Sequence, residues 1–402
     1  MKYCIALVFI FSCYFFIACS KPDKPSPSAP GITPAGGNNK VVYIASENGK
    51  LYALDAGTGN EVWNFQLNTA GGRTAQFSSP AFAGGIIYVG STDQNIYAVN
   101  ASTGKEVWHY KTQSTPGFFY SSPVVADGTV FLPGYENRLY ALDAASGVLR
   151  WSRDFPREFE SSPAYFKNKL FITCKDGVLY GLNASTGNTL WSVGGSGYNW
   201  GFDYSISSPC VKDSVVYALT NDIANPAVIL NELSTEDGSP HHGGYAAYSV
   251  ASTSSYITSP AIDDSIVYFG VMEGSLYAVK NGDYMFFNKR WSFKTGGAIY
   301  SSPSFDDSTV YVGSNDGFLY AVNKFSGNLK WKFYGESIQI ASSPVVSDGV
   351  VFVGGSNYVY ALYAKDGTVK WQSAAGIPVS SSPCVITKQG AAIHGSVSGM
   401  KN

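Results

Sequence analysis

The sequence has little charge and no excess of either sign. Only 14% of its 402 residues are charged, where about 25% is usual, and 27 Lys and Arg face 29 Asp and Glu for a net charge of -2. Proteins that bind nucleic acid through its phosphates carry an excess of positive charge. The composition therefore excludes a nucleic-acid-binding protein that depends on bulk positive charge.

Cysteine and histidine are also scarce. Beyond the N-terminal segment the cysteines are Cys174, Cys210 and Cys384, an odd number at wide spacing, which argues against a disulfide framework. We interpret them as small buried strand residues. The four histidines form no HxxxH pattern and the chain has no CxxC pair, so the sequence predicts no metal site.

The residues that do dominate are Val, Tyr, Phe, Ser, Thr and Gly. Aromatic residues make up 15% of the chain, and it contains 43 glycines. This composition is typical of short strands joined by tight turns rather than of helices. With 45% hydrophobic residues the chain can bury a large core.

The N-terminal segment differs from the rest. The apolar run after Lys2 has the length of a signal-peptide core, and it ends in FIAC, which resembles a bacterial lipobox. We predict a lipoprotein signal peptide over residues 1–18, lipidation at Cys19, a proline-rich tether over residues 19–38 and a folded body over residues 39–402. An ordinary secretory signal is the alternative.

A repeat of about 40 residues organises the body. The string LYALDAGTGNEVW, residues 51–63, recurs with close variants that end at Trp108, Trp151, Trp191, Trp331 and Trp371, and a stretched copy ends at Trp291. Between Trp191 and Trp291 the corresponding string is VILNELSTEDGSPHH, in which His242 occupies the tryptophan register.

A second marker gives the number of units. Ser-Ser-Pro or Thr-Ser-Pro occurs eight times, ending at residues 80, 123, 163, 209, 260, 303, 344 and 383. A third apolar run, such as IIYVGS, lies between each marker and the following LYAL string. Each of the eight units is therefore predicted to contain four strands, and proline fits the first residue of a strand because it lacks an N–H group.

The units must stack to bury both faces of each sheet. We predict an all-β, eight-bladed β-propeller of four-stranded antiparallel blades, in which the N-terminal and C-terminal strands share one blade. Truncation before Ser380 should then be severely destabilising. The run AAIHGSVSG after Gly390 resembles a surplus copy of the third run, and the repeat assigns it no place.

The turns of the repeat have recognisable chemistry. In DAxTG and its variants, Asp55, Asn100, Asp143 or Asn183 can accept main-chain N–H groups. The glycine four residues later takes a positive φ in such a turn. Near-identical turns of this kind are expected to be scaffold.

The repeat resembles the tryptophan-docking repeat of the PQQ-type, quinoprotein-like β-propellers over residues 40–402. The resemblance implies that the repeated tryptophans pack between neighbouring blades and join them through the indole N–H. The residues that receive this structural docking role are Trp63, Trp108, Trp151, Trp191, Trp291, Trp331 and Trp371.

The resemblance leaves more than one function open. Lipobox, tether and a compact propeller are similar to the noncatalytic BamB-like lipoproteins of the outer-membrane β-barrel assembly machinery. That branch implies a protein-interaction scaffold with no cofactor, a protein partner in the bacterial envelope and a lipid anchor in the outer membrane. The alternatives are a quinoprotein oxidoreductase with PQQ and calcium, although the typical Cys-Cys pair is lacking, and a glycan-binding propeller.

Variable loops before the Ser-Ser-Pro markers collect aromatic and charged residues on one face. Such loops on a rigid scaffold suit recognition, and the alternative is that their aromatics fold back over the inner strands. Glu158 and Glu160 are interpreted as solvated rather than as an acid/base pair. The candidate binding residues are Arg73, Phe118, Phe119, Tyr120, Arg157, Glu160, Tyr198, Trp200, Asp203 and Tyr204.

Two further groups have both a structural and a functional interpretation. Carboxylates recur before the LYAL strings, where they suit either turn chemistry or cation attraction. They are Glu47, Asp93, Glu136, Asp176, Asp222, Glu273 and Asp316. His241 and His242 are interpreted as replacement packing for the missing tryptophan, with a metal site as the alternative. No catalytic residue is predicted, and no GxSxG motif is present.

Overall fold

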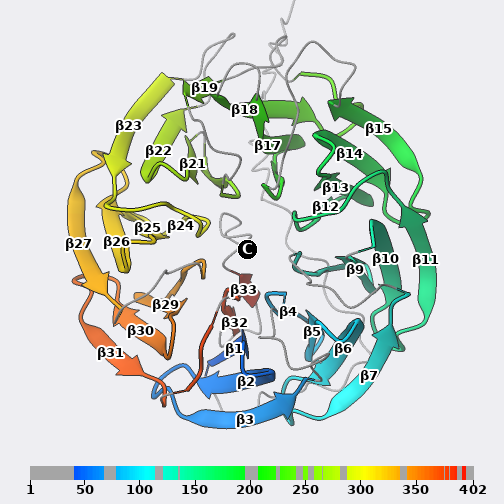
Figure 1. Cartoon of the computed structure of the whole chain (residues 1–402), viewed down its shortest axis with the longest axis horizontal. Helices are drawn as coiled ribbons and strands as arrows, with labels where there is room; N and C mark the ends of the chain where they lie inside the picture. The colour runs from blue at the N-terminus through cyan, green and yellow to red at the C-terminus, as the bar shows by residue number, and fades with distance from the viewer. Residues whose placement is uncertain are drawn as a thin grey trace, which may run out of the picture.

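The computed structural model describes 33 strands and no helix in residues 40–67, 78–113, 121–134, 136–194, 207–222, 227–240, 248–251, 258–264, 266–280, 288–335, 342–374, 376–379, 381–386 and 392–394. The strands form eight antiparallel sheets arranged in a ring around a central axis (Figure 1), and we call the region about this axis the channel. The predicted eight-bladed propeller is confirmed. We number the blades in the order in which their outer strands occur in the chain.

The first half of the ring runs from the closing blade to the irregular one. The strands of each blade are given from the channel outward. The first blade contains β32 (Cys384–Ile386), β1 (Val41–Ser46), β2 (Lys50–Asp55) and β3 (Glu61–Gln66). The second contains β4 (Ala81–Ala83), β5 (Ile86–Gly90), β6 (Asn95–Asn100) and β7 (Glu106–Lys111). The third contains β8 (Val124–Ala126), β9 (Thr129–Pro133), β10 (Arg138–Asp143) and β11 (Leu149–Asp154). The fourth contains β12 (Ala164–Phe166), β13 (Lys169–Thr173), β14 (Val178–Asn183) and β15 (Thr189–Gly194).

The second half follows the same order. The fifth blade contains β16 (Cys210–Lys212), β17 (Val215–Asp222), β18 (Ala227–Ser234) and β19 (Tyr248–Ala251). The sixth contains β20 (Ala261–Asp263), β21 (Ile266–Gly270), β22 (Ser275–Lys280) and β23 (Asn288–Lys294). The seventh contains β24 (Ser304–Phe305), β25 (Thr309–Gly313), β26 (Phe318–Asn323) and β27 (Leu329–Tyr334). The eighth contains β28 (Val345–Ser347), β29 (Val350–Gly354), β30 (Val359–Tyr363) and β31 (Val369–Gln372).

The two ends of the chain close the ring, as predicted. β1 pairs antiparallel with β32 through Val41–Ile386, Val42–Val385 and Tyr43–Cys384. The run after Gly390, which the repeat left without a place, forms a fifth strand in this blade, β33 (Ala392–His394). It pairs with the channel side of β32.

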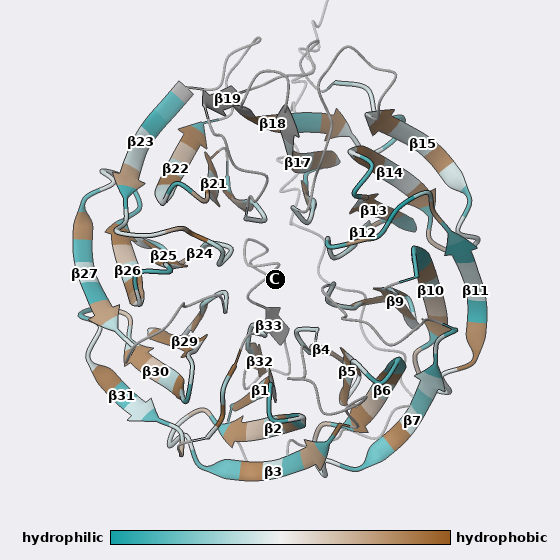
Figure 2. Ribbon diagram, viewed as in Figure 1, coloured by the Kyte–Doolittle hydropathy of each residue, from teal (hydrophilic) through white to brown (hydrophobic). Residues whose placement is uncertain are grey.

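The hydrophobic core is divided among the eight seams between blades. Each cluster of buried side chains takes residues from two neighbouring blades; one, for example, joins Tyr88, Ile96 and Ala98 of the second blade to Val130 and Leu132 of the third. The outermost strands are exposed at alternate positions, and Figure 2 shows them banded in polar and apolar colours. Where their side chains are described, the second and third strands are largely buried on both faces, because each blade packs between two neighbours.

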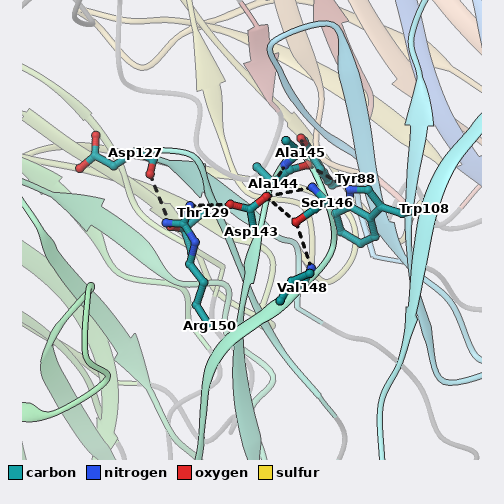
Figure 3. Close-up of polar contacts among 10 residues, drawn as sticks. All are labelled: Tyr88, Trp108, Asp127, Thr129, Asp143, Ala144, Ala145, Ser146, Val148 and Arg150. Carbon is teal, nitrogen blue, oxygen red and sulfur yellow. Dashed lines mark hydrogen bonds and ion pairs between the residues drawn. The ribbon is translucent and has the colours of Figure 1, made fainter.

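The repeated tryptophans lie at these seams. In the second blade, Trp108 donates its indole N–H to the carbonyl of Ala144 in the third at 3.0 Å, and the phenol of Tyr88 donates to the same carbonyl at 3.0 Å (Figure 3). A Cβ atom on Gly147 would lie 2.7 Å from the indole, so the turn needs glycine there. All seven tryptophans donate to a carbonyl of the following blade at 2.9 to 3.3 Å: Trp63 to Ala101, Trp108 to Ala144, Trp151 to Ala184, Trp191 to Thr235, Trp291 to Lys324, Trp331 to Ala364 and Trp371 to Ala56.

Candidate functional site: the loop face and the channel mouth

The antiparallel order gives the ring two different faces. On one face, which we call the turn face, the turn between first and second strands meets the turn between third and fourth, as where Ala144 N–H donates to Gly128 at 2.9 Å. On the opposite face, the loop face, the segment that leaves each blade meets the loop between second and third strands, as where Thr112 N–H donates to Gln94 at 2.9 Å. The described segments before the Ser-Ser-Pro markers, residues 155–160 and 295–300, belong to the loop face.

The turn face is built from repeated, internally bonded turns. The carboxylate of Asp143 accepts the N–H groups of Ala145 and Ser146 at 3.1 and 2.9 Å, and Arg150 binds its other oxygen at 2.7 Å (Figure 3). The hydrogen bond from Arg150 is the main reason that the pKa of Asp143 lies well below its usual range. Gly147 has a φ of +72°, as its turn position requires. These polar groups form hydrogen bonds with one another within the turn, so we interpret the turn face as structural.

The carboxylates of the loop face also belong to turns. Asp316 accepts the N–H of Phe318 at 3.1 Å through one oxygen and the phenol of Tyr320 at 2.6 Å through the other. Burial and this hydrogen bond raise the pKa of Tyr320 to about 12. Each phenol bond joins a carboxylate to the tyrosine four residues later: Asp93 to Tyr97, Glu136 to Tyr140, Asp176 to Tyr180 and Asp316 to Tyr320. For these four carboxylates the geometry therefore favours the turn interpretation over cation attraction.

The first blade forms this turn with a different residue. Glu47 lies in the corresponding loop, as expected, but Asn48 occupies the position four residues before Tyr52. Its side-chain amide donates to the Tyr52 oxygen at 2.8 Å, and its carbonyl oxygen accepts the N–H of Lys50 at 3.2 Å. An uncharged residue thus forms the same turn, which indicates that the turn needs an acceptor rather than a negative charge.

Two of the candidate binding residues lie in the described part of the loop face, between the third and fourth blades. The side chain of Arg157 is exposed. Glu160 is 17% exposed and forms an ion pair with Lys175, which also pairs with Glu158 at 3.1 Å. Glu160 is thus largely shielded from water beside Lys175, whereas Glu158, with 44% of its side chain exposed, remains in contact with solvent as expected.

The aromatic residues of the same segment fold inward. Phe155 and Phe159 are buried, with ring centroids 4.8 Å apart, and Phe155 also packs against Tyr180 at 5.1 Å. In this loop the aromatic residues therefore fold back into the core, which is the alternative to an exposed binding surface. The remaining candidates, Arg73, Phe118, Phe119, Tyr120, Tyr198, Trp200, Asp203 and Tyr204, lie outside the residues that the structure describes, as do Cys19, His241 and His242.

Further exposed residues on the loop face were missed from the sequence. Tyr300, 39% exposed, directly precedes a Ser-Ser-Pro marker, in the same register as Tyr120. Aligning the residues before each marker would have found it. Tyr334 is also exposed at the end of β27 and packs on Phe318, with centroids 5.2 Å apart, while the ammonium of Lys332 lies 4.2 Å from the Phe318 centroid. Exposed aromatics flanked by charge suit a recognition surface.

The serines of the marker form a closed ring at the loop-face mouth of the channel. In each blade the second serine donates its main-chain N–H to the hydroxyl oxygen of the second serine of the next blade at 2.8 to 3.2 Å. The circuit runs from Ser79 to Ser122, Ser162, Ser208, Ser259, Ser302, Ser343, Ser382 and back to Ser79. The first residue of the marker acts within its blade; the hydroxyl of Ser78, for instance, accepts the N–H of Gly90 at 2.8 Å.

The described residues offer no obvious place for a metal. Among them no three His, Cys, Asp or Glu side chains gather into a cluster that could hold a metal ion. Cys174 and Cys384 are buried in different blades, and burial is the main cause that raises the pKa of the Cys174 thiol to about 12. A thiol with this pKa is not a reactive nucleophile.

The fifth blade departs from the others at its docking position. Opposite each tryptophan in the register lies a small residue, and a Cβ on Gly181 would come within 2.3 Å of Trp191. Counting from Gly238, the corresponding position in the fifth blade is Glu232, which is 4% exposed. Its carboxyl pairs with the phenol of Tyr217 on β17, and burial, partly offset by this bond, raises the pKa of Glu232 to about 7. Sequence analysis did not single this residue out.

The blade geometry and the docking define a PQQ-type β-propeller. The sequence model of the family described as outer membrane protein assembly factor BamB matches residues 21–123, 113–239 and 287–399. The chain belongs to this family. No protein of curated function matches it. Among the residues that the structure describes, no helix is long and apolar enough to cross a membrane.

Solved structures similar to this one have diverse functions. BamB from Moraxella catarrhalis is 15% identical, with a TM-score of 0.60, and the match covers 79% of this chain and 93% of that one. The computationally designed Ika8 protein is 15% identical, with a TM-score of 0.63 and coverage of 82% and 98%. Quinohemoprotein alcohol dehydrogenase from Comamonas testosteroni is 13% identical, with a TM-score of 0.61 and coverage of 80% and 71%. At these identities the likeness shows the fold alone.

Proposed function

We propose that the chain is a noncatalytic lipoprotein, anchored through Cys19 and the tether over residues 19–38, that acts in the assembly of outer-membrane proteins. Its propeller serves as a scaffold that binds a protein partner in the bacterial envelope through the loop face. The observation that carries this proposal is membership of the family described as outer membrane protein assembly factor BamB. Placement in the outer membrane is part of the proposal.

The difference between the two faces supports binding at the loop face. Turn-face groups such as Asp143 and Arg150 are satisfied within their own turns. The loop face carries exposed Arg157 and Tyr300 on connections that vary between blades, and exposed Tyr334 at the end of β27. Binding residues commonly lie on variable loops held by a rigid scaffold.

Photo-crosslinking in intact cells tests this proposal. A photoreactive phenylalanine analogue is placed at Phe119, Trp200 and Tyr300, and at Tyr363 on the turn face as a matched control. Tyr300 and Tyr363 are 39% and 41% exposed, so they differ in face rather than in accessibility. We expect adducts with a subunit of the barrel-assembly machinery from the loop-face positions only. Identical adducts from Tyr363, or none from any loop-face position, would overturn the proposal.

A quinoprotein oxidoreductase is the second candidate, because the same fold occurs in a quinohemoprotein alcohol dehydrogenase. The described residues fit PQQ and calcium poorly. They contain no cluster of three metal-ligating side chains, and the serines at the channel mouth bond to one another. Titration of the mature lipoprotein with PQQ and calcium, followed by absorbance, discriminates the two functions: stoichiometric binding would favour the enzyme.

A further inference from the structure

In the part of the chain that the structure describes, the sheet of the first blade has one strand more than the sheets of the other blades. Its sheet order is β3, β2, β1, β32, β33, whereas each of the other seven described sheets ends at its first strand on the channel side. Cys384, Val385 and Ile386 of β32 pair with β1 on one edge and with His394, Ile393 and Ala392 of β33 on the other. Among the described inner strands, β32 alone therefore has both edges paired within its sheet.

The sequence explains why the extra strand lies where it does. In the third blade, β8 leads directly into β9, which takes the outer edge of β8. β33 follows β32 along the chain in the same way, with residues 387–391 between the two strands. However, the outer edge of β32 is already taken by β1 from the other end of the chain, so β33 pairs on the inner edge. That edge can therefore accept an extended segment.

β33 lies next to two other blades as well as its own. β33 contacts β4 of the second blade and β28 of the eighth, as well as its partner β32. Figure 1 shows it inside the ring, close to the channel axis. An extended segment at this place thus touches three consecutive inner strands.

The pairing is also short. Three register pairs join β33 to β32. Each hydrogen bond makes a small net contribution because the separated strand bonds to water instead. A strand held by so few bonds can leave and be replaced without unfolding the rest of the blade.

We propose that the channel-side edge of β32 is a strand-addition site, that β33 is its resident occupant, and that an extended segment of a protein partner binds there when β33 leaves. Main-chain hydrogen bonds supply the recognition, so the segment must be free of proline at the paired positions. This proposal rests on the scaffold function and names the form of partner segment that the channel takes. It places a second contact within the ring, apart from the loop-face aromatics.

A synthetic peptide tests the site. The probe is the fluorescently labelled peptide of residues 390–402, and the two proteins are the full mature lipoprotein and a variant that ends at Gly390. The resident strand competes at an effective concentration of the order of millimolar, so we expect the peptide to bind the shortened variant about tenfold more tightly. The matched control is the same peptide with Ile393→Pro, which removes an N–H group from the paired segment and should not bind. Equal binding of both peptides to the folded variant, or binding of neither, overturns the proposal.

A full-length variant covers the case in which the shortened chain fails to fold. His394→Cys places a thiol directly opposite Cys384 in the register, at a separation that a disulfide can span. Oxidation should lock β33 in place and abolish peptide binding that the reduced form retains. Ile393→Cys, opposite Val385, is the control that forms no lock. Peptide binding that is unchanged by the lock would contradict the proposal.

These outcomes are separate from those of the cross-linking experiment. A protein partner captured at Tyr300 with no peptide binding would leave the scaffold function in place and remove the strand-addition site. Peptide binding without any captured partner would leave the strand-addition site in place and remove the scaffold function.

Discussion

The second and fifth blades share one strand order but differ at their outer half. In the second blade, Trp108 packs on Tyr88, lies opposite Ala98 in the register and donates to Ala144 across the seam. In the fifth blade the position that matches Ala98 is Glu232, and β18 pairs with β19 over four residues only.

The serine circuit through the fifth blade is nevertheless the same as in the other blades. Ser208 donates its N–H to Ser259 and accepts that of Ser162, as in every regular blade. This difference indicates that every blade needs the serine circuit of the inner strands. The docking pair, a tryptophan and the small residue opposite it in the register, can be replaced in a single blade. The four predictions that follow test this division.

The largest effect is expected where the inner ring is cut. Deletion of residues 381–402 removes β32, Ser381 and Ser382, so the first blade loses its inner strand and the serine circuit is opened. We expect the loss of cooperative thermal unfolding, measured by far-ultraviolet circular dichroism. The variant that ends at Gly390 retains β32 and is the control. A cooperative transition near that of the control would show that the ring does not depend on its closing strand.

Removal of a docking tryptophan should cost less. Trp108→Ala empties a buried site in the seam between the second and third blades, and we expect a loss of about 3 to 5 kcal/mol in the free energy of unfolding. Trp108→Phe keeps the contact with Tyr88 but loses the bond to Ala144, at a cost of about 1 kcal/mol beyond the lost volume. Denaturant titration measures both. Equal losses would mean that the indole N–H, and not packing, holds the seam.

The fifth blade should respond to pH in a way that the regular blades do not. Burial raises the pKa of Glu232 to about 7, so the folded protein holds this proton more tightly than the unfolded chain does. Its contribution to stability is then complete below the unfolded pKa of about 4.3 and is lost as the pH rises from there through 7, by roughly 3 to 4 kcal/mol.

Glu232→Gln removes this dependence. We expect the variant to be more stable than the parent at pH 8 and nearly equal to it at pH 4. Glu236→Gln, at an exposed position of the same blade, is the matched control and should leave the profile unchanged. Parallel pH profiles for the parent and Glu232→Gln would contradict the assignment of the titration to Glu232.

The smallest effect sharpens the comparison. Ser162→Ala and Ser208→Ala each remove one acceptor from the inner circuit, from a regular seam and from the seam that enters the fifth blade. We expect the same loss, about 1 kcal/mol, at both sites, because the bonds are alike. A clearly smaller loss at Ser208 would show that the fifth blade is loosened at the centre as well as at the edge.

Much of the fold could be predicted because each blade repeats the same local solution. The strings that end in tryptophan and the Ser-Ser-Pro markers predicted strands, turns and blade number from residues that are close in sequence. The place of β33 could not be predicted in this way, because it depends on β1 from the far end of the chain occupying the outer edge of β32.

The candidate site was harder for a related reason. Glu160 looks like a surface carboxylate until Lys175, from the neighbouring loop, is seen to bridge it to Glu158. Glu232 looks polar and solvated unless its register is counted from Gly238, which places it in a core position. Contacts between elements decide the state of such side chains, and the sequence presents only their chemistry.

The serine circuit has a consequence for how such a protein can change over time. A hydrogen-bonded chain that closes on itself has no first donor and no last acceptor, so its polar groups are satisfied for any number of members. Duplication or deletion of one whole repeat would leave no orphaned group at the centre, provided that the new ring closes. The serine circuit therefore does not limit the number of blades. We expect the packing between neighbouring blades, rather than the serine circuit, to determine how many repeats close the ring.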